Sequence, residues 1–266
     1  MSENPDRYTH GHHESVLRSH RWRTAENSAG FLLPHLRPGM SLLDVGCGPG
    51  NITADLADRV ADGPVLGLDL PPDVIANAAA EHVRANLTFR VGDVYALDIA
   101  DDTFDVVYAH QVLQHLGDPI AALKQMRRVT KPGGIVAVRD SDYGAFVWTP
   151  ADPRLDRWMA IYHQLTAANH ADPDAGRHLH QWVREAGFTD LTVSSSTWTF
   201  HTADERAWWG GLWADRVRAS EYARQSLEHG FATADELDDI AAAFADWAAD
   251  EDGLFIVTHG EVLARV

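Results

Sequence analysis

The sequence predicts an α/β fold in which helices cover both faces of a doubly wound, largely parallel sheet. In its first half, five short apolar runs alternate with helix-forming segments, the pattern of consecutive strand–helix–strand units. The runs are apolar at successive positions, as expected for strands buried on both faces. A glycine-rich turn directly follows the first run, at the point where such folds bind ligands.

Each element of the first half has its own support in the sequence. The expected strands cover residues 41–46, 64–70, 87–93, 104–110 and 134–140. The expected helices cover residues 51–61, 72–85 and 119–130. Asp118 is a suitable capping residue for the third helix, and Pro119 suits its first position.

The second half has a different pattern. Helices are expected over 152–170 and 175–188, and the alternation over 189–200 predicts a strand. A long helical stretch rich in Trp and Ala covers 203–249, and a final strand covers 253–266. Two late strands therefore bracket a helical insertion, which we expect to shape a substrate pocket.

The N-terminal segment over 14–36 is compatible with a helix, and Pro34 with the Arg-Pro-Gly at 37–39 marks its end. No run of about 18 apolar residues indicates a membrane span. The first twenty residues lack the apolar core of a secretory signal. The lone cysteine, Cys47, excludes an intramolecular disulfide and favours a reducing compartment. We therefore expect a cytoplasmic protein.

The formal charge is strongly negative, −17 from 22 basic and 39 acidic residues. Such a surface repels phosphate backbones, so a nucleic-acid partner is not expected. Alternatively, the negative charge serves only to keep the protein in solution.

The glycine turn carries Gly46, Gly48 and Gly50. Its G-x-G-x-G spacing, with Asn51 next, departs from the G-x-G-x-x-G of dinucleotide-binding folds. Asp44 precedes the turn by two positions, where a carboxylate works against a pyrophosphate and suits an ammonium group. A nicotinamide-dependent dehydrogenase is therefore disfavoured.

Two more carboxylates end neighbouring strands. Asp69 lies 19 residues after Gly50, where an acidic side chain can accept hydrogen bonds from both ribose hydroxyls. Asp93 ends the third strand and could accept a hydrogen bond from an adenine amine. Together with Asp44, the strand ends offer an ammonium site, a ribose site and an adenine site.

These motifs occur in a familiar order: "LLDVGCGPGNIT", "VLGLDL", "GDVYAL", "FDVVYAHQVLQHLGDP" and "VTKPGG". Over about residues 40–140 the chain resembles the class I S-adenosylmethionine-dependent methyltransferases, and more narrowly the branch with the ubiquinone/menaquinone-biosynthesis-type enzymes. The resemblance implies a Rossmann-like, seven-stranded sheet whose last strand is antiparallel. It divides the chain into an N-terminal helical arm or lid (1–40), a cofactor-binding core (41–150) and a C-terminal part of the same domain with the insertion (151–266).

The resemblance also implies roles for ten cofactor-site residues. Asp44 and the three glycines would line the methionine part, Asp69 and Leu70 would hold ribose and adenine, and Asp93 and Val94 would border the adenine ring. His110 and Gln111, at the end of the fourth strand, would lie beside the cofactor and face the acceptor. One departure is Gln114, which stands before His115 where many relatives have a His. It weakens any mechanism that needs a His pair there.

In the family, N-terminal segments often cover the cofactor, which would make Tyr8 and His12 lid residues in contact with the substrate. The histidines at 10, 12 and 13 could instead form a plain arm or bind a metal as purification tags do. No carboxylate or cysteine cluster accompanies them at a ligand spacing, so no metal site is expected.

Methyl transfer from a sulfonium is an in-line displacement, so catalysis comes largely from positioning. A base is needed only where the nucleophile loses a proton, and His110 is the first candidate. Alternatively, its ring packs on the methionine part or bonds to backbone. The end of the fifth strand and the segment after it carry Asp140, Tyr143 and Trp148, which could contact the acceptor. Alternatively, this segment could fold onto the insertion.

Three tryptophans at helical spacing, Trp208, Trp209 and Trp213, belong either to the core or to a ligand box for a flat acceptor. We expect an enzyme that methylates C, O or N of a small organic acceptor and converts S-adenosylmethionine to S-adenosylhomocysteine. A protein or peptide methyltransferase and a non-catalytic cofactor-binding module are the alternatives. A small-molecule acceptor is the expected partner, and a homodimer is left open.

Overall fold

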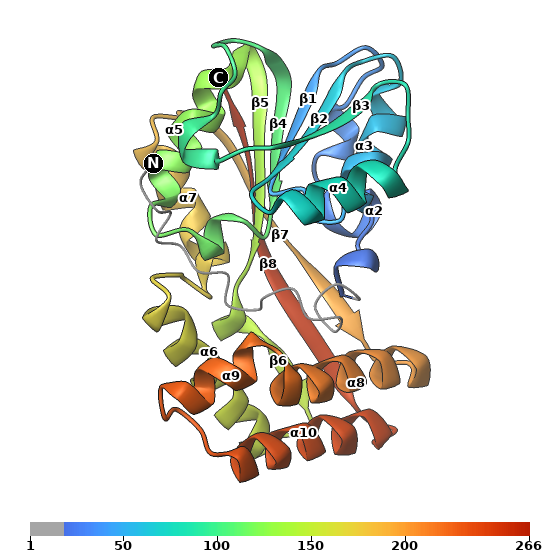
Figure 1. Ribbon diagram of the computed structural model, residues 1–266, viewed down its shortest axis with the longest axis vertical. Helices are drawn as coiled ribbons and strands as arrows, with labels where there is room; N and C mark the ends of the chain where they lie inside the picture. The colour runs from blue at the N-terminus through green and yellow to red at the C-terminus, as the bar shows by residue number, and fades with distance from the viewer. Residues whose placement is uncertain (1–18) are drawn as a thin grey trace.

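A computed structural model describes residues 19–266 of the chain. Its sheet has eight strands in the order β3-β2-β1-β4-β5-β8-β6, with β7 paired to β8 (Figure 1). Neighbours among the first five strands pair in parallel. Their bounds are β1 Leu42–Val45, β2 Val65–Asp69, β3 Leu87–Val91, β4 Phe104–His110 and β5 Thr130–Ser141. The predicted doubly wound α/β class is confirmed.

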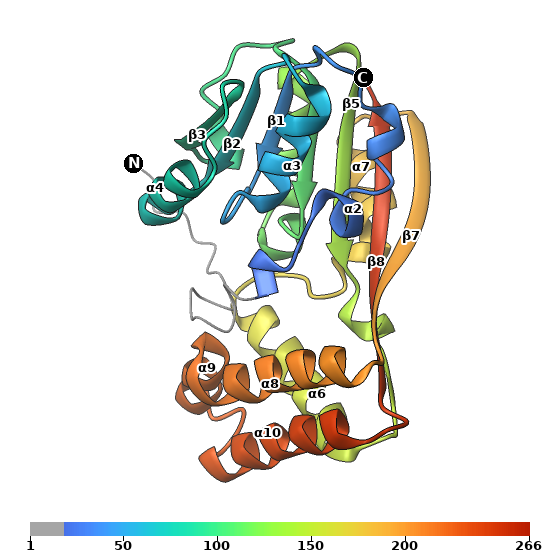
Figure 2. The same cartoon turned by 90° about the vertical axis from the view of Figure 1, so that its right-hand side faces the viewer.

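Helices cover both faces of this sheet (Figure 2). On one face, α2 (Ala25–Ser28) and α3 (Asn51–Val60) close a core with β1, β4 and β5. On the other face, α5 (Pro119–Val129) and α7 (Ala175–Glu185) do the same. Helix α4 (Pro72–Glu81) packs beside β2 and β3 on the same face as α3 (Figure 1). Helix α5 begins as predicted, because the Asp118 carboxylate accepts a hydrogen bond from the Ala121 amide.

A second lobe of helices lies at one end of the sheet (Figure 1). It contains α6 (Pro153–Ala168) and three helices from the predicted insertion, α8 (Ala203–Ala219), α9 (Glu221–Glu228) and α10 (Ala234–Ala249). Capping boxes formed by Thr202 with Glu205 and by Thr233 with Glu236 start α8 and α10. The core of this lobe is dense in aromatic rings, among them Trp158, Trp213, Phe244 and Phe255.

Two long strands connect the sheet to the helical lobe. β7 (Asp190–Phe200) and β8 (Leu254–Arg265) pair antiparallel over their whole lengths. One half of β8, His259 to Arg265, pairs antiparallel with β5. The other half pairs with the short β6 (Val147–Thr149). The antiparallel last strand is thus confirmed, and it belongs to both lobes.

Two expectations need correction. The sheet has eight strands rather than seven, because β6 adds three residues that are too few to give a period in the sequence. A continuous helix over 14–36 is wrong for the described part. Residues 19–21 are helical, Thr24 is extended and caps the four-residue α2, and a short turn of helix over Leu33–His35 carries Pro34. Tyr8, His12 and the neighbouring histidines lie outside the described residues.

Helix α7 approaches β8 so closely that only glycine fits at the contact. A Cβ on Gly176 would lie 2.8 Å from the Gly260 nitrogen, and one on Gly260 would collide with the Gly176 carbonyl. The two backbones therefore touch without intervening side chains.

We expect Gly260→Ala to lower the free energy of unfolding by about 1–3 kcal/mol, because the added methyl must push α7 off the sheet. Gly211→Ala is the matched control: this exposed glycine in α8 has nothing within 4 Å of a Cβ, so alanine should be neutral or stabilising. Urea unfolding measures both. Equal stability of the two variants would contradict the contact.

Candidate functional site

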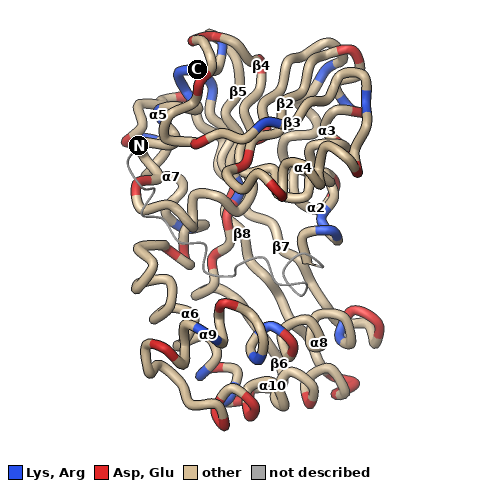
Figure 3. The backbone as a smooth tube through the Cα atoms, in the orientation of Figure 1, with Lys and Arg blue, Asp and Glu red and all other residues tan. Residues whose placement is uncertain are grey.

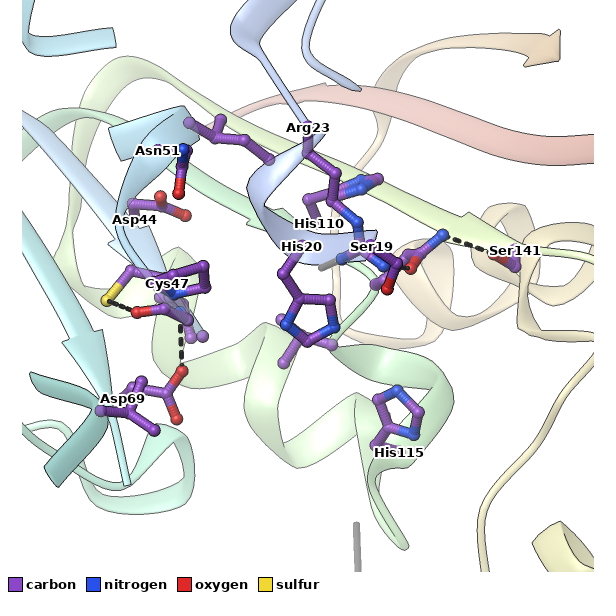
Figure 4. Close-up of a pocket in the computed structure, with 18 of the residues that line it drawn as sticks. Ser19, His20, Arg23, Asp44, Cys47, Asn51, Asp69, His110, His115 and Ser141 are labelled. Atoms are coloured by element: carbon purple, nitrogen blue, oxygen red, sulfur yellow. Dashed lines mark hydrogen bonds between the residues drawn. The ribbon is translucent and has the colours of Figure 1, made fainter. Parts of the chain in front are cut away.

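A cavity of about 260 Å³ lies between the sheet and the helical lobe. It opens at the carboxyl ends of β1, β2 and β4, the edge at which doubly wound sheets bind ligands. Figure 4 shows part of its lining. The predicted site residues on its wall are Asp44, Gly46, Gly48, Asp69, Leu70, Val94, His110, Gln111 and Tyr143.

The glycine turn forms one end of the cavity. Gly46, Gly48 and Gly50 all have positive φ, 69°, 54° and 85°, which favours glycine. A Cβ on Gly46 would overlap the Val112 side chain, whereas one on Gly48 would meet only the His20 ring at 3.9 Å. The backbone at Gly48 thus leaves room for a ligand. Gly50 is not among the lining residues and starts α3.

Asp44 is buried at this end. Its Oδ2 accepts a 2.6 Å hydrogen bond from the Thr53 hydroxyl. Burial raises the pKa of the Asp44 carboxyl to about 7, and the hydrogen bond from Thr53 only partly offsets that effect. A ligand cation would favour the ionised form, so the carboxyl is suited to an ammonium group.

The two other strand-end carboxylates differ in their surroundings. Asp69 lines the cavity, and its carboxylate accepts hydrogen bonds from the Gly48 and Leu70 amides at 2.8 and 2.7 Å. Asp93 caps a short helical turn by accepting a hydrogen bond from the Tyr95 amide and is not among the lining residues. Gly92 and Val94 on either side of it do line the cavity.

His110 is buried in the cavity floor. Its Nε2 has no hydrogen-bond partner among the described residues, and its Nδ1 lies 3.5 Å from an Arg139 nitrogen. Burial first, and then the charges of Arg139 and Arg23, hold the pKa of His110 well below its usual value. The ring is therefore neutral and a weak proton acceptor.

Gln111 adopts a positive φ of 53°, which is rare for a residue other than glycine. Its amide donates to the Arg139 carbonyl at 2.7 Å. The side chain bridges two segments: it donates to the Ser141 hydroxyl at 2.7 Å and accepts from Arg23 at 2.6 Å. The strained backbone thus holds a polar connection across the cavity floor.

The predicted acceptor residues separate into two groups. Tyr143 lines the cavity and stacks on Tyr162, with ring centroids 4.1 Å apart. Asp140 and Trp148 are not among the lining residues. The Asp140 carboxylate is fully buried and accepts from the Gln114 amide at 3.0 Å, and burial raises its pKa to about 8. Trp148 stacks on Phe255 in the helical lobe.

Gln114 is structural here, since its side-chain oxygen accepts a hydrogen bond from the Ser141 amide. His115 lines the cavity, and burial lowers its pKa to about 3. The tryptophans of α8, Trp208, Trp209 and Trp213, pack in the helical lobe and also line the cavity, so their positions suit both interpretations, core and ligand box.

Several lining residues were not predicted. Ser19, His20, Trp22 and Arg23 reach the cavity from the N-terminal segment, and Arg216 reaches it from α8. Trp22 packs against Trp198 of β7 and Trp208 of α8, with ring centroids 5.2 and 5.3 Å apart. No local motif identifies these residues, because their place depends on packing between distant segments.

Two further observations concern the described part of the chain. Within residues 19–266, no group of three or more His, Cys, Asp or Glu side chains is arranged to hold a metal ion. None of the helices described there has the length and apolar character needed to cross a membrane.

The sequence has clear relatives. A family model described as a methyltransferase domain matches residues 36–187. An uncharacterised methyltransferase of Schizosaccharomyces pombe is 33% identical over 272 residues, covering 97% of this chain and 96% of that protein. A trans-aconitate 2-methyltransferase of Deinococcus radiodurans is 36% identical over 143 residues, covering 52% of this chain and 49% of that protein.

A solved structure shares the fold. It is the phosphoethanolamine N-methyltransferase 2 of Haemonchus contortus in complex with phosphomonomethylethanolamine and S-adenosylhomocysteine, with a TM-score of 0.54 at 18% identity. The match covers 86% of this chain and 49% of that one, so this chain spans about half the length of the solved protein. With the family model and a full-length relative in agreement, the chain belongs to the class I S-adenosylmethionine-dependent methyltransferases.

Proposed function

We propose that the protein transfers the methyl group of S-adenosylmethionine to a small organic acceptor. The observation that carries this proposal is that a single cavity joins the glycine turn, at one end, to an aromatic wall from the helical lobe at the other. Cofactor and acceptor would meet inside it, with their reacting atoms held in line. Residues 19–23 and α8 contribute to the walls of this space, which favours a small acceptor over a peptide.

The cofactor fits the residues at the glycine end. In this proposal Asp44 pairs with the methionine ammonium, and the Gly46–Gly48 backbone lies along the methionine part. Asp69 accepts hydrogen bonds from the ribose hydroxyls, and Leu70 and Val94 flank the adenine. Asp93 would act indirectly, because its carboxylate fixes the turn that carries Val94.

The transfer itself needs little acid–base chemistry. A lone pair on the acceptor forms a bond to the methyl carbon while the carbon–sulfur bond breaks and its electrons stay on sulfur. The low pKa of His110 makes it a poor base, so we propose that its neutral ring positions the reactants. A proton on the acceptor atom would leave to water. A cationic imidazole would repel the sulfonium, which a neutral ring does not.

We expect calorimetry to detect binding of S-adenosylhomocysteine, and Asp69→Ala to weaken it about tenfold or more by removing charge-assisted hydrogen bonds to the ribose. Asp98→Ala, at an exposed position outside the cavity, should bind like the parent protein. No binding by the parent protein would refute the proposed function, and undiminished binding by Asp69→Ala would refute only the role of Asp69.

The raised pKa of Asp44 predicts a pH-dependent affinity. Below about pH 7 the free carboxyl holds a proton that must leave before it can pair with an ammonium, so S-adenosylhomocysteine should bind about tenfold more weakly at pH 6 than near pH 7.5. Asp44→Asn should remove this dependence. Thr53→Val deletes the hydrogen bond that favours the ionised form, so it should move the midpoint to higher pH. Titration calorimetry across this pH range measures the affinity of each variant. An unchanged pH profile in Asp44→Asn would contradict the assignment of the dependence to Asp44.

A further inference from the structure

His110 carries a buried ring nitrogen for which the described chain supplies no partner. The residue ends β4, lines the cavity and is 6% exposed. Its Nε2 forms no hydrogen bond with any of residues 19–266. Acidic residues are spread over both lobes (Figure 3), yet none of the described carboxylates reaches this nitrogen. An unpaired buried polar atom is costly, so one at the wall of a ligand cavity indicates a contact with the ligand.

The other ring nitrogen shows where the proton of His110 lies. Nδ1 is 3.5 Å from Nη1 of Arg139, and a guanidinium donates hydrogen bonds but cannot accept them. Arg139 pairs with Glu261, and although burial lowers the pKa of Arg139 to about 10, the group stays charged near neutral pH. Nδ1 must therefore carry a lone pair. Because the ring is neutral, its single proton lies on Nε2.

The polar side chains near His110 already have partners of their own. The Gln111 oxygen accepts from Arg23 at 2.6 Å, and the Gln111 nitrogen donates to the Ser141 hydroxyl at 2.7 Å. Figure 4 shows His110 beside Arg23. The centroid of the His110 ring lies 5.8 Å from that of Trp198, which also lines the cavity. The Nε2 proton is therefore left for a ligand that lies among aromatic rings.

A second unpaired donor belongs to the same lining. The indole N–H of Trp209 is buried and has no hydrogen-bond partner among the described residues. Both groups only donate, so a ligand amine or ammonium would face N–H against N–H. A hydroxyl could accept from either, but its own proton would need an acceptor, and the lone pair of His110 already faces Arg139. A carbonyl oxygen has lone pairs and no proton, which suits both donors.

We propose that the methyl acceptor is a flat carbonyl compound whose oxygen accepts a hydrogen bond from Nε2 of His110. This inference rests on the proposed methyltransferase function and specifies its substrate class. The rings of Trp198 and Trp209 offer flat apolar surface for the rest of the molecule. A carbonyl oxygen is a weak nucleophile, so the methyl group goes to another atom. The hydrogen bond then fixes the orientation of that atom with respect to the sulfonium.

The first test is the tautomer of His110, which nitrogen NMR of the full-length protein with isotopically labelled histidine reads directly. The signal that disappears in His110→Phe identifies the residue. We expect the proton on Nε2 near neutral pH, both in the protein alone and in the protein saturated with S-adenosylhomocysteine. A proton on Nδ1, or on both nitrogens, would overturn the inference.

The second test compares 1-indanone with indane, which has the same ring system without the oxygen. Both are titrated into the full-length protein saturated with S-adenosylhomocysteine and followed through the backbone amide signals. We expect 1-indanone to bind about tenfold more tightly and to shift the Nε2 proton of His110. His110→Phe keeps an aromatic ring and should abolish this preference, whereas His110→Gln can still donate and should retain part of it. His180→Phe, at an exposed position on α7 outside the cavity, is the matched control.

Equal affinity for the two compounds, no binding of either, or a preference that survives in His110→Phe would overturn the inference. So would a Nε2 proton that shifts on binding S-adenosylhomocysteine and not on adding 1-indanone, because the cofactor would then be its partner. Binding of S-adenosylhomocysteine is measured first on every variant, which reports folding and tests the methyltransferase function separately. If the cofactor product binds but the preference for 1-indanone is absent, only the acceptor class is wrong.

Discussion

The register of β8 is the constraint on which both lobes depend. One side of this strand pairs with β5 and then β6, and its other side pairs with β7 throughout. Alternate residues Phe255, Val257, His259 and Glu261 share one face, so that face passes from the aromatic core of the helical lobe to the polar floor of the cavity. A shift of one residue in the pairing register of β8 would turn these four side chains to the opposite face of the sheet. The close contact of Gly176 with Gly260 permits no such slip.

A buried ion pair in the cavity floor connects the pairing of the strands with the electrostatics of the site. Arg139 of β5 and Glu261 of β8 are opposite each other in the register, with a nitrogen–oxygen distance of 3.2 Å, and Ser194 and Ser196 of β7 donate to the same carboxylate. Such a pair contributes little net stability but is costly to break. The Arg139 charge also reaches His110 and depresses its pKa. Burial is the first cause of the low pKa of His110, and the charge of Arg139, which joins these strands, adds to it.

Local chemistry explains why much of this was predictable. The strand-helix alternation, the turn at Gly46–Gly50, and the strand-end positions of Asp44 and Asp69 all follow from short sequence patterns. The features that the sequence did not predict depend on contacts between segments that are far apart along the chain. β6 exists only because β8 extends beyond the sheet, and Arg216 reaches the cavity only because α8 folds back toward it. The strand predicted to end at Asp93 stops at Val91, and Asp93 instead caps the next turn, with its carboxylate accepting from the Tyr95 amide.

The residues that line the cavity would govern both acceptor specificity and the rate of methyl transfer. A sulfonium is already a good leaving group, so an enzyme gains most by fixing the acceptor atom in line with the methyl group. The rings of Trp209 and Trp213 line the cavity and would fix the plane of a flat acceptor. Packing against these rings demands no proton transfer, which agrees with the neutral state of His110. Asp44 and Asp69 at the glycine turn would hold the donor, so that donor and acceptor are bound at opposite ends of one cavity.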